Sequence, residues 1–228
     1  MSDYARPVVD PQNFTDAEGA PIDYGTRWEG SPDPDAYSVV SHPERFAPLY
    51  VIADALIDWL TAEYDVVVED DPSVASDLLH LPRPVERAVR ITPRDTDAAS
   101  VTFAFTDFPG VILHAGLLQD HPFPVCGCDA CDETWQSTAD DLEWIVRTVA
   151  QGGFTEALDP NDDARLYVSL EEPGVGSRSG SVRADEFPAD RFDAVKSQLA
   201  GRGSWAPWPR RLTPVGDPEP GQGGRRSR

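Results

Sequence analysis

Cysteine and long apolar runs are both scarce in this chain of 228 residues. Three cysteines are too few for the dense disulfide framework of a small secreted domain. No stretch of 18 apolar residues occurs, which argues against a membrane-spanning helix, and the first residues lack the basic and apolar regions of a signal peptide. We therefore expect a cytoplasmic protein that has no membrane partner and keeps its thiols reduced.

Basic residues are also few. The chain has 19 Lys and Arg against 40 Asp and Glu, a formal net charge of -21. Because phosphate binding needs a basic footprint, this balance argues against a nucleic-acid partner. An acidic surface is typical of a well-solvated protein, and it also suits a module that captures a basic protein partner, as an immunity or antitoxin-like protein does. Hydrophobic residues make up 40% of the chain, which is enough for a core.

The clearest helical pattern begins at Ser41. Ser41 and Glu44 have the spacing of a capping box, and Pro43 suits a first helical turn. Apolar residues then recur at helical spacing: Phe46, Leu49, Tyr50, Ala53, Leu56, Ile57, Leu60 and Tyr64. The pattern predicts a helix from Ser41 to Tyr64 with one face in the core.

Strand patterns follow this helix. Residues 88–92, 101–106 and 111–115 alternate between apolar and polar side chains, and short polar or Pro-Gly segments separate them. They predict an antiparallel meander of three strands. Shorter signals predict a strand at 66–68 and a short helix at 73–79.

The second half contains two more helical patterns. One begins near Trp135 and ends at Gly152 and Gly153, and the other covers residues 190–199. Between them, residues 166–170 predict a strand and residues 175–180 a flexible Gly/Ser loop. The order of elements predicts one α+β domain over residues 37–200, an antiparallel sheet with helices packed on one face.

The two ends differ in composition from this domain. Residues 1–36 are rich in Pro, Asp and Gly and predict an irregular N-terminal arm, in which Tyr24 and Trp28 are candidates for docking onto the core. Residues 201–228 are rich in Pro, Gly and Arg and predict a disordered tail.

All three cysteines lie within six residues, in the sequence Cys126-Gly-Cys128-Asp-Ala-Cys131. Thiolates this close bind a soft or borderline metal, or exchange electrons with one another. Gly127 adopts backbone angles that other residues resist, which allows the three sulfurs to turn towards one centre. We name residues 121–133 the Cys loop, and we expect it to bind a metal.

Zinc is the metal we expect, in a structural role. A structural zinc site is tetrahedral and needs a fourth ligand beside the three thiolates. His121 is our candidate, and the alternatives are His114, His80 and Asp129. Copper(I) is a further alternative, whereas an iron–sulfur cluster fits less well because it usually takes four cysteines.

A thiol-redox protein is the alternative interpretation of the Cys loop. A helix that begins near Asp132 would lower the pKa of the Cys131 thiol, so that Cys128 or Cys131 attacks and a neighbouring thiol resolves. The chain lacks the histidine and cysteine patterns of zinc proteases and deaminases, and it has no serine nucleophile elbow and no dinucleotide fingerprint. The sequence therefore favours a protein without enzymatic activity.

Three segments carry a resemblance. They are His-Pro-Glu-Arg-Phe-Ala-Pro-Leu at 42–49, Tyr-Asp-Val at 64–66 and Phe-Pro-Val-Cys-Gly-Cys-Asp-Ala-Cys-Asp-Glu at 123–133. Together they resemble an uncharacterised actinobacterial family of unknown function, over residues 20–200. The Cys loop is the most distinctive of the three segments, and the resemblance implies no activity.

Overall fold

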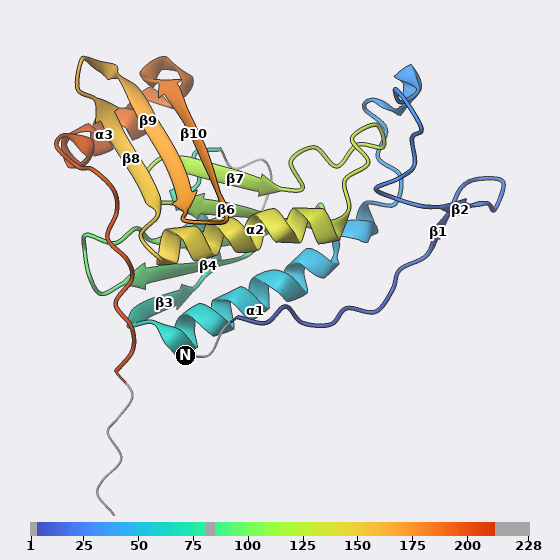
Figure 1. The fold of residues 1–228 in the computed structure, drawn as a ribbon, viewed down its shortest axis with the longest axis horizontal. Coiled ribbons are helices and arrows are strands. Elements are labelled where there is room, and N and C mark those ends of the chain that lie inside the picture. The colour runs from blue at the N-terminus through green and yellow to red at the C-terminus, as the bar shows by residue number, and fades with distance from the viewer. Residues whose placement is uncertain (1–3, 81–84, 213–228) are drawn as a thin grey trace, which may run out of the picture.

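A five-stranded antiparallel sheet is the largest unit of the fold, and its strands follow one another in chain order (Figure 1). The computed structural model describes residues 4–80 and 85–212. The strands of this sheet are β3 (Val66–Asp70), β4 (Val85–Pro93), β5 (Val101–Thr106), β6 (Gly110–Ala115) and β7 (Gln119–Phe123). The predicted three-stranded meander is thus its centre, and β3 and β7 are its edges.

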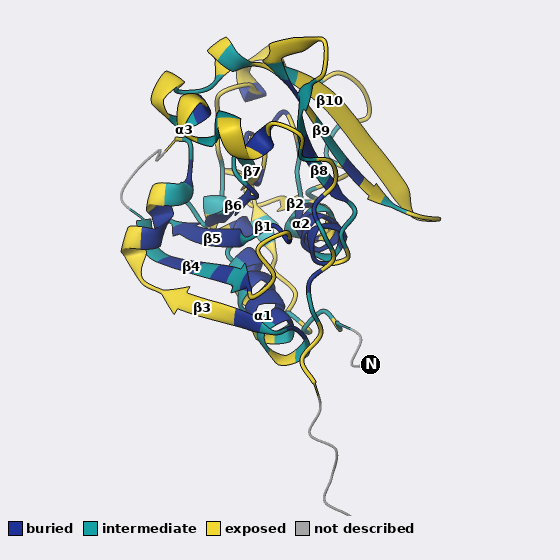
Figure 2. Cartoon of the chain, turned by 90° about the vertical axis from the view of Figure 1, so that its left-hand side faces the viewer, coloured by how far each residue is buried: buried dark blue, intermediate teal, exposed yellow. Residues whose placement is uncertain are grey.

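Helices α1 (Pro48–Glu63) and α2 (Trp135–Ala150) lie side by side over one face of this sheet (Figures 1 and 2). They bury the apolar positions that the helical spacing predicts, and Leu56 of α1 and Leu142 of α2 are both fully buried. The strands turn Val89, Phe103 and Leu113 towards them, because alternate residues of a strand share a face. This layer is the hydrophobic core, and the α+β class is confirmed.

The start of the first helix differs from the prediction. Residues Pro43–Phe46 form a short 3₁₀ helix (η2), and α1 begins only at Pro48. The residue before η2 is His42, which has a left-handed backbone (φ 52°) and makes no capping hydrogen bond. The expected capping box is absent because the amide of Ser41 donates to Asp129 of the Cys loop, and its carbonyl accepts from Arg45.

The opposite face of the sheet is polar. Arg90, Thr102, His114 and Asp120 are cross-strand neighbours in one row over β4, β5, β6 and β7. The 3₁₀ helix η3 (Pro72–Asp77) covers part of the row, and Asp77 accepts hydrogen bonds from Arg90 and, at 2.7 Å, from Thr102. Neighbours in a row share a face, so His114 belongs to this polar face.

A second, three-stranded antiparallel sheet was not predicted as a separate unit. It consists of β8 (Phe154–Asp159), β9 (Asp162–Glu172) and β10 (Gly176–Arg183), and α3 (Ala189–Leu199) packs against it. The prediction of a flexible loop at 175–180 is wrong, since residues 176–183 pair with β9 in continuous register. The Gly- and Ser-rich sequence of β10 has little strand preference of its own, and the hydrogen bonds of β9 impose the conformation.

Glu156 of β8 connects the two sheets. Its carboxylate is fully buried and accepts the amides of Leu117 and Leu118, each at 2.9 Å, and the indole of Trp205 at 3.3 Å. Burial nevertheless raises the pKa of Glu156 from 4.5 to about 6.

The predicted disorder of the tail does not extend to residues 203–212. Trp205 and Trp208 are buried, the Trp205 amide donates to Phe154 at 2.8 Å, and the Trp208 indole donates to Ala99 at 2.8 Å. Burial of two indoles outweighs the local Pro and Gly content. The rest of the predicted tail, residues 213–228, lies outside the described residues.

The N-terminal arm contains two short paired strands, β1 (Phe14–Thr15) and β2 (Pro21–Ile22), and one 3₁₀ turn, η1 (Pro34–Ala36). It reaches the Cys loop at the right of the view in Figure 1. None of the helices in the described ranges is long and apolar enough to cross a membrane.

Candidate metal centre

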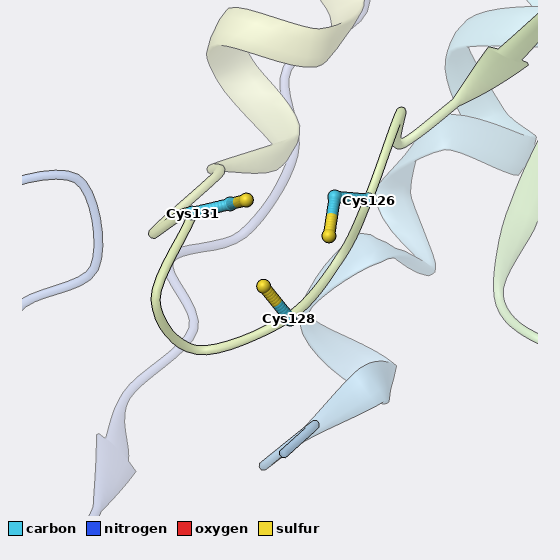
Figure 3. Close-up of side chains that lie close together, drawn as sticks. All are labelled: Cys126, Cys128 and Cys131. Carbon is cyan, nitrogen blue, oxygen red and sulfur yellow. The ribbon is translucent and has the colours of Figure 1, made fainter. Parts of the chain in front are cut away.

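The three cysteines converge on one point. Their Sγ atoms all lie within 4.8 Å of one another, and Figure 3 shows the side chains of Cys126, Cys128 and Cys131 turned towards a common space. Cys128 is buried, whereas Cys126 and Cys131 are exposed. The loop that carries them links β7 to α2, so the sheet and the helix fix its two ends.

Glu133 organises the backbone of this loop. Its carboxylate accepts three consecutive amides, from Val125 at 3.1 Å, Cys126 at 3.0 Å and Gly127 at 2.7 Å. Gly127 has a left-handed φ of 74°, and a Cβ atom there would lie 3.0 Å from the ring of Phe108. Glycine is therefore required at the position between the first two cysteines, as predicted from its conformational freedom.

The N-terminal arm and the residues after it pack against the Cys loop. The amide of Asp129 donates to the Val39 carbonyl at 2.8 Å, and the amide of Ala130 donates to Ala36 at 3.2 Å. The indole of Trp28 donates to the Asp129 carbonyl at 3.1 Å, so Trp28 docks onto the Cys loop, whereas the sequence predicted docking onto the core. We name these contacts between residues 27–45 and 126–133 the arm–loop junction.

Charged side chains complete the junction. The Asp129 carboxylate accepts the Ser41 amide at 2.9 Å and lies 3.3 Å from the Arg27 guanidinium. Burial opposes ionisation, but these partners hold the pKa of Asp129 below its ordinary value. Arg45 is buried and donates to the Gly127 carbonyl at 2.9 Å. Asp129 and Arg45 therefore each bind a backbone group across the junction, Asp129 the Ser41 amide and Arg45 the Gly127 carbonyl.

Cys128 and Cys131 differ in acidity. Hydrogen bonds from the Cys126 thiol, from the Cys131 amide and thiol and from the Ser38 amide lower the pKa of Cys128 to about 7. The hydrogen bond of Cys131 to Cys128 raises the pKa of Cys131 to about 12. The expectation of an activated Cys131 is wrong. Helix α2 begins at Trp135 with Thr134 as its cap, so its positive end is too far along the chain to lower the pKa of Cys131.

None of the candidate fourth ligands belongs to the sulfur group as described. The described group of metal-ligand atoms within 4.8 Å contains the three sulfurs alone. His114 Nδ1 pairs with Asp120 Oδ1 at 2.7 Å on the polar face, and His80 is exposed after η3. Asp129 is engaged as described above. His121 lies on β7 opposite Leu113, and its role as a ligand stays a prediction.

His121 has an unusual environment. Its Nε2 atom is buried without a hydrogen-bond partner. Burial lowers its pKa from 6.5 to about 4, against the attraction of Asp120 and with additional repulsion from His114 and Arg178. His121 is therefore neutral at neutral pH.

The sequence alone does not reveal that Glu133, Arg45 and Ser38 hold the Cys loop in place. Glu133 has a local signal, a carboxylate two residues after the last cysteine and immediately before a helix cap. Arg45 has none, because its position within an expected helix predicts an exposed side chain.

Sheets, helices and the cysteine cluster together define an α+β protein with a three-thiol candidate metal centre. The chain belongs to a family of unknown function, DUF6226, whose model matches residues 10–212. The predicted resemblance to an uncharacterised family is thereby confirmed. No curated protein and no solved structure matches the chain.

Proposed function

We propose that this protein is a non-enzymatic zinc protein of the cytoplasm, in which Cys126, Cys128 and Cys131 bind one Zn²⁺ that stabilises the arm–loop junction. The observation that carries the proposal is the approach of the three Sγ atoms to within 4.8 Å of one another. Zinc–sulfur bonds of about 2.3 Å in a tetrahedron separate the sulfurs by about 3.8 Å, which falls within this limit.

The composition of the junction supports a structural role. Its apolar cluster consists of Ala36, Cys128 and Ala130, with Trp28 packed against them. So few apolar side chains contribute little burial energy, and a metal bound only to the folded loop would add stability in proportion to its affinity. The amide of Ser38 that bonds to the Cys128 sulfur links the metal ligands directly to the segment after the arm.

Elemental analysis of protein purified without added metal tests the proposal, together with hydrogen exchange at residues 36–41. We expect close to one zinc per chain in the wild type and none in Cys128→Ser, with faster exchange at these amides in the variant and unchanged exchange in α1. His121→Gln tests the fourth ligand: the variant should bind less zinc if His121 is a ligand, and as much zinc as the wild type if it is not.

A metal-free wild type with reduced thiols, whose exchange does not respond to added zinc, would contradict the proposal. A wild type that instead forms a disulfide within the cluster would favour the thiol-redox alternative, with Cys128 as the attacking thiol because its pKa is the lowered one.

The net charge of -21 favours a second candidate function, capture of a basic protein partner. Co-purification at low and at high salt tests it, because screening weakens an association between exposed charges. A partner retained at low salt and lost at high salt is expected, and a lone monomer at low ionic strength would contradict this candidate.

A further inference from the structure

We infer that a zinc ion held by Cys126, Cys128 and Cys131 has one coordination position open to solvent, and that this position takes an uncharged nitrogen donor of the imidazole class from outside the chain. The inference rests on the proposed zinc site. It concerns what binds to the metal and not whether the metal binds.

The neighbouring carboxylates already accept hydrogen bonds from the loop and the arm. Both oxygens of Glu133 accept loop amides, and Asp129 binds the Ser41 amide and Arg27. Asp132 accepts the Arg27 amide at 2.9 Å through Oδ2, and its unpartnered Oδ1 lies outside the group of ligand atoms that the sulfurs form. If one of these carboxylates moved to the metal, the hydrogen bonds by which it fixes the loop or the arm would break.

None of the described histidines places a nitrogen in the group that the sulfurs form. The Nδ1 of His42 lies 3.2 Å from Glu44 Oε1, and its Nε2 lies 3.1 Å from the Thr15 carbonyl. His114 is paired with Asp120, and His121 belongs to β7. Within the described ranges, the sulfurs have no nitrogen or oxygen ligand atom in their group.

The sulfur cluster has one buried and two exposed members. Cys128 points into the protein, where its sulfur accepts backbone amides, whereas Cys126 and Cys131 are exposed. A metal bound by the three sulfurs therefore has a protein side and a solvent side. Zinc takes four ligands in tetrahedral sites, so three protein sulfurs leave one position for a ligand that arrives from the solvent side.

Charge selects the class of ligand. Zn²⁺ with three thiolates carries one net negative charge. The junction adds three carboxylates, Asp129, Asp132 and Glu133, against two guanidiniums, Arg27 and Arg45, so the surroundings are negative as well. Asp132 Oδ1 is in addition buried without a hydrogen-bond partner. An anion would bring a further negative charge to the metal and would be repelled, whereas a neutral imidazole would not. Three cysteines with one histidine are also a common zinc ligand set.

Cobalt(II) substitution tests the inference, with imidazole and azide as probes. Cobalt bound by thiolates has charge-transfer bands in the near ultraviolet and d–d bands in the visible, and the latter respond to a change of the fourth ligand. We expect imidazole to shift the d–d bands saturably, at half-saturating concentrations at least about tenfold lower than azide, since about 1.4 kcal/mol of repulsion corresponds to that factor. His121→Gln should give the same titration.

Two results would overturn the inference while the zinc site stands. If the cobalt–thiolate bands respond to neither probe, the protein itself fills or covers the fourth coordination position. Tighter binding of azide than of imidazole would show that the ligand class is wrong. If cobalt–thiolate bands do not form at all, the proposed zinc site fails as well, and Cys128→Ser provides the reference spectrum for that outcome.

The nitrogen donor has two sources, a free imidazole compound or a histidine on a protein surface. Light scattering of the zinc-loaded protein after gel filtration distinguishes a second copy as the source. A dimer that imidazole dissociates indicates a histidine of another copy, and a monomer at all concentrations indicates a free ligand.

Discussion

The core under α1 and α2 and the arm–loop junction are held together by different forces. In the core, large apolar side chains such as Phe46, Leu49 and Phe103 are fully buried. In the junction, the buried apolar residues are Ala36, Cys128 and Ala130, and backbone hydrogen bonds to Asp129, Asp132 and Glu133 define the structure. The core is therefore stabilised mainly by apolar burial, whereas the junction depends on polar contacts and, in our proposal, on a metal.

Phe103→Ala should cause the largest loss of stability, and this loss should arise in the core alone. Phe103 lies on β5 and is fully buried. Its truncation removes apolar contacts and leaves a cavity, so we expect a loss of about 3–5 kcal/mol in the free energy of unfolding. Urea denaturation measures it, with Tyr167→Ala on the exposed side of β9 as the control. The same loss should appear with and without zinc, and a loss that zinc abolishes would contradict the separation of the two regions.

His121 lies on β7, which leads from the sheet into the Cys loop, and its protonation should make the free energy of unfolding depend on pH. Its pKa is about 4 in the folded protein and 6.5 when unperturbed, so the unfolded chain binds the proton more readily between these values. Its contribution is present above pH 6.5 and lost as the pH falls towards 4, at most about 3 kcal/mol. In the wild type, the free energy of unfolding should fall over this window, and in His121→Gln the fall should be smaller.

The matched control for this pH series is His80→Gln, which removes an exposed imidazole and leaves the buried one in place. Glu156 acts in the opposite direction: its raised pKa of about 6 adds stability below pH 4.5 that is lost as the pH rises through 6. An identical pH dependence in His121→Gln and the wild type would show that His121 is accessible to protons in the folded state.

Glu133→Gln should weaken the junction and leave the core unchanged. The variant replaces a carboxylate that accepts three amides, and hydrogen bonds to a charged acceptor contribute about 1.5–3 kcal/mol. We expect zinc affinity to fall by about tenfold or more, because the loop that orients the sulfurs is less fixed. Competition with a chromogenic chelator measures the affinity. Glu18→Gln removes the same charge from an exposed part of the arm, and an equal fall in both variants would point to net charge instead.

Trp28→Phe should have the smallest effect. It removes the indole that donates to the Asp129 carbonyl and keeps an aromatic ring at the edge of the junction. The loss of one hydrogen bond corresponds to about 1 kcal/mol, or an increase of about fivefold in the exchange of the Asp129 and Ala130 amides. Tyr37→Phe, at an exposed position, is the control. Exchange that stays at the wild-type rate would show that Trp28 does not hold the arm on the loop.

Several elements were predictable because their signal is local. The faces of α1 and α2 follow from apolar residues at helical spacing, and the central strands β4, β5 and β6 follow from alternation. The three cysteines were predictable as one site for the same reason, since Cys126, Cys128 and Cys131 are close in sequence and Gly127 permits the turn.

Other elements depend on residues distant in the chain. The segment at β10 is a strand because β9 offers a complete row of partners, and residues 203–212 are ordered because Trp205 and Trp208 find space against Phe154 and Ala99. Ser41 does not cap a helix because Asp129 takes its amide. In each case a long-range contact outweighs a local preference.

The sequence by itself determined the α+β class, the two core helices, the acidic charge and the clustering of the thiols, since each of these depends on spacing or composition alone. The tertiary structure decided which groups surround the thiols: it assigned Glu133 and Asp129 to the loop backbone, placed His114 on the polar face of the sheet, and brought Ser38 to the Cys128 sulfur. The physical reason is that the groups around the thiols come from segments distant in the sequence, and only the packing of sheet, helix and arm fixes which segments meet.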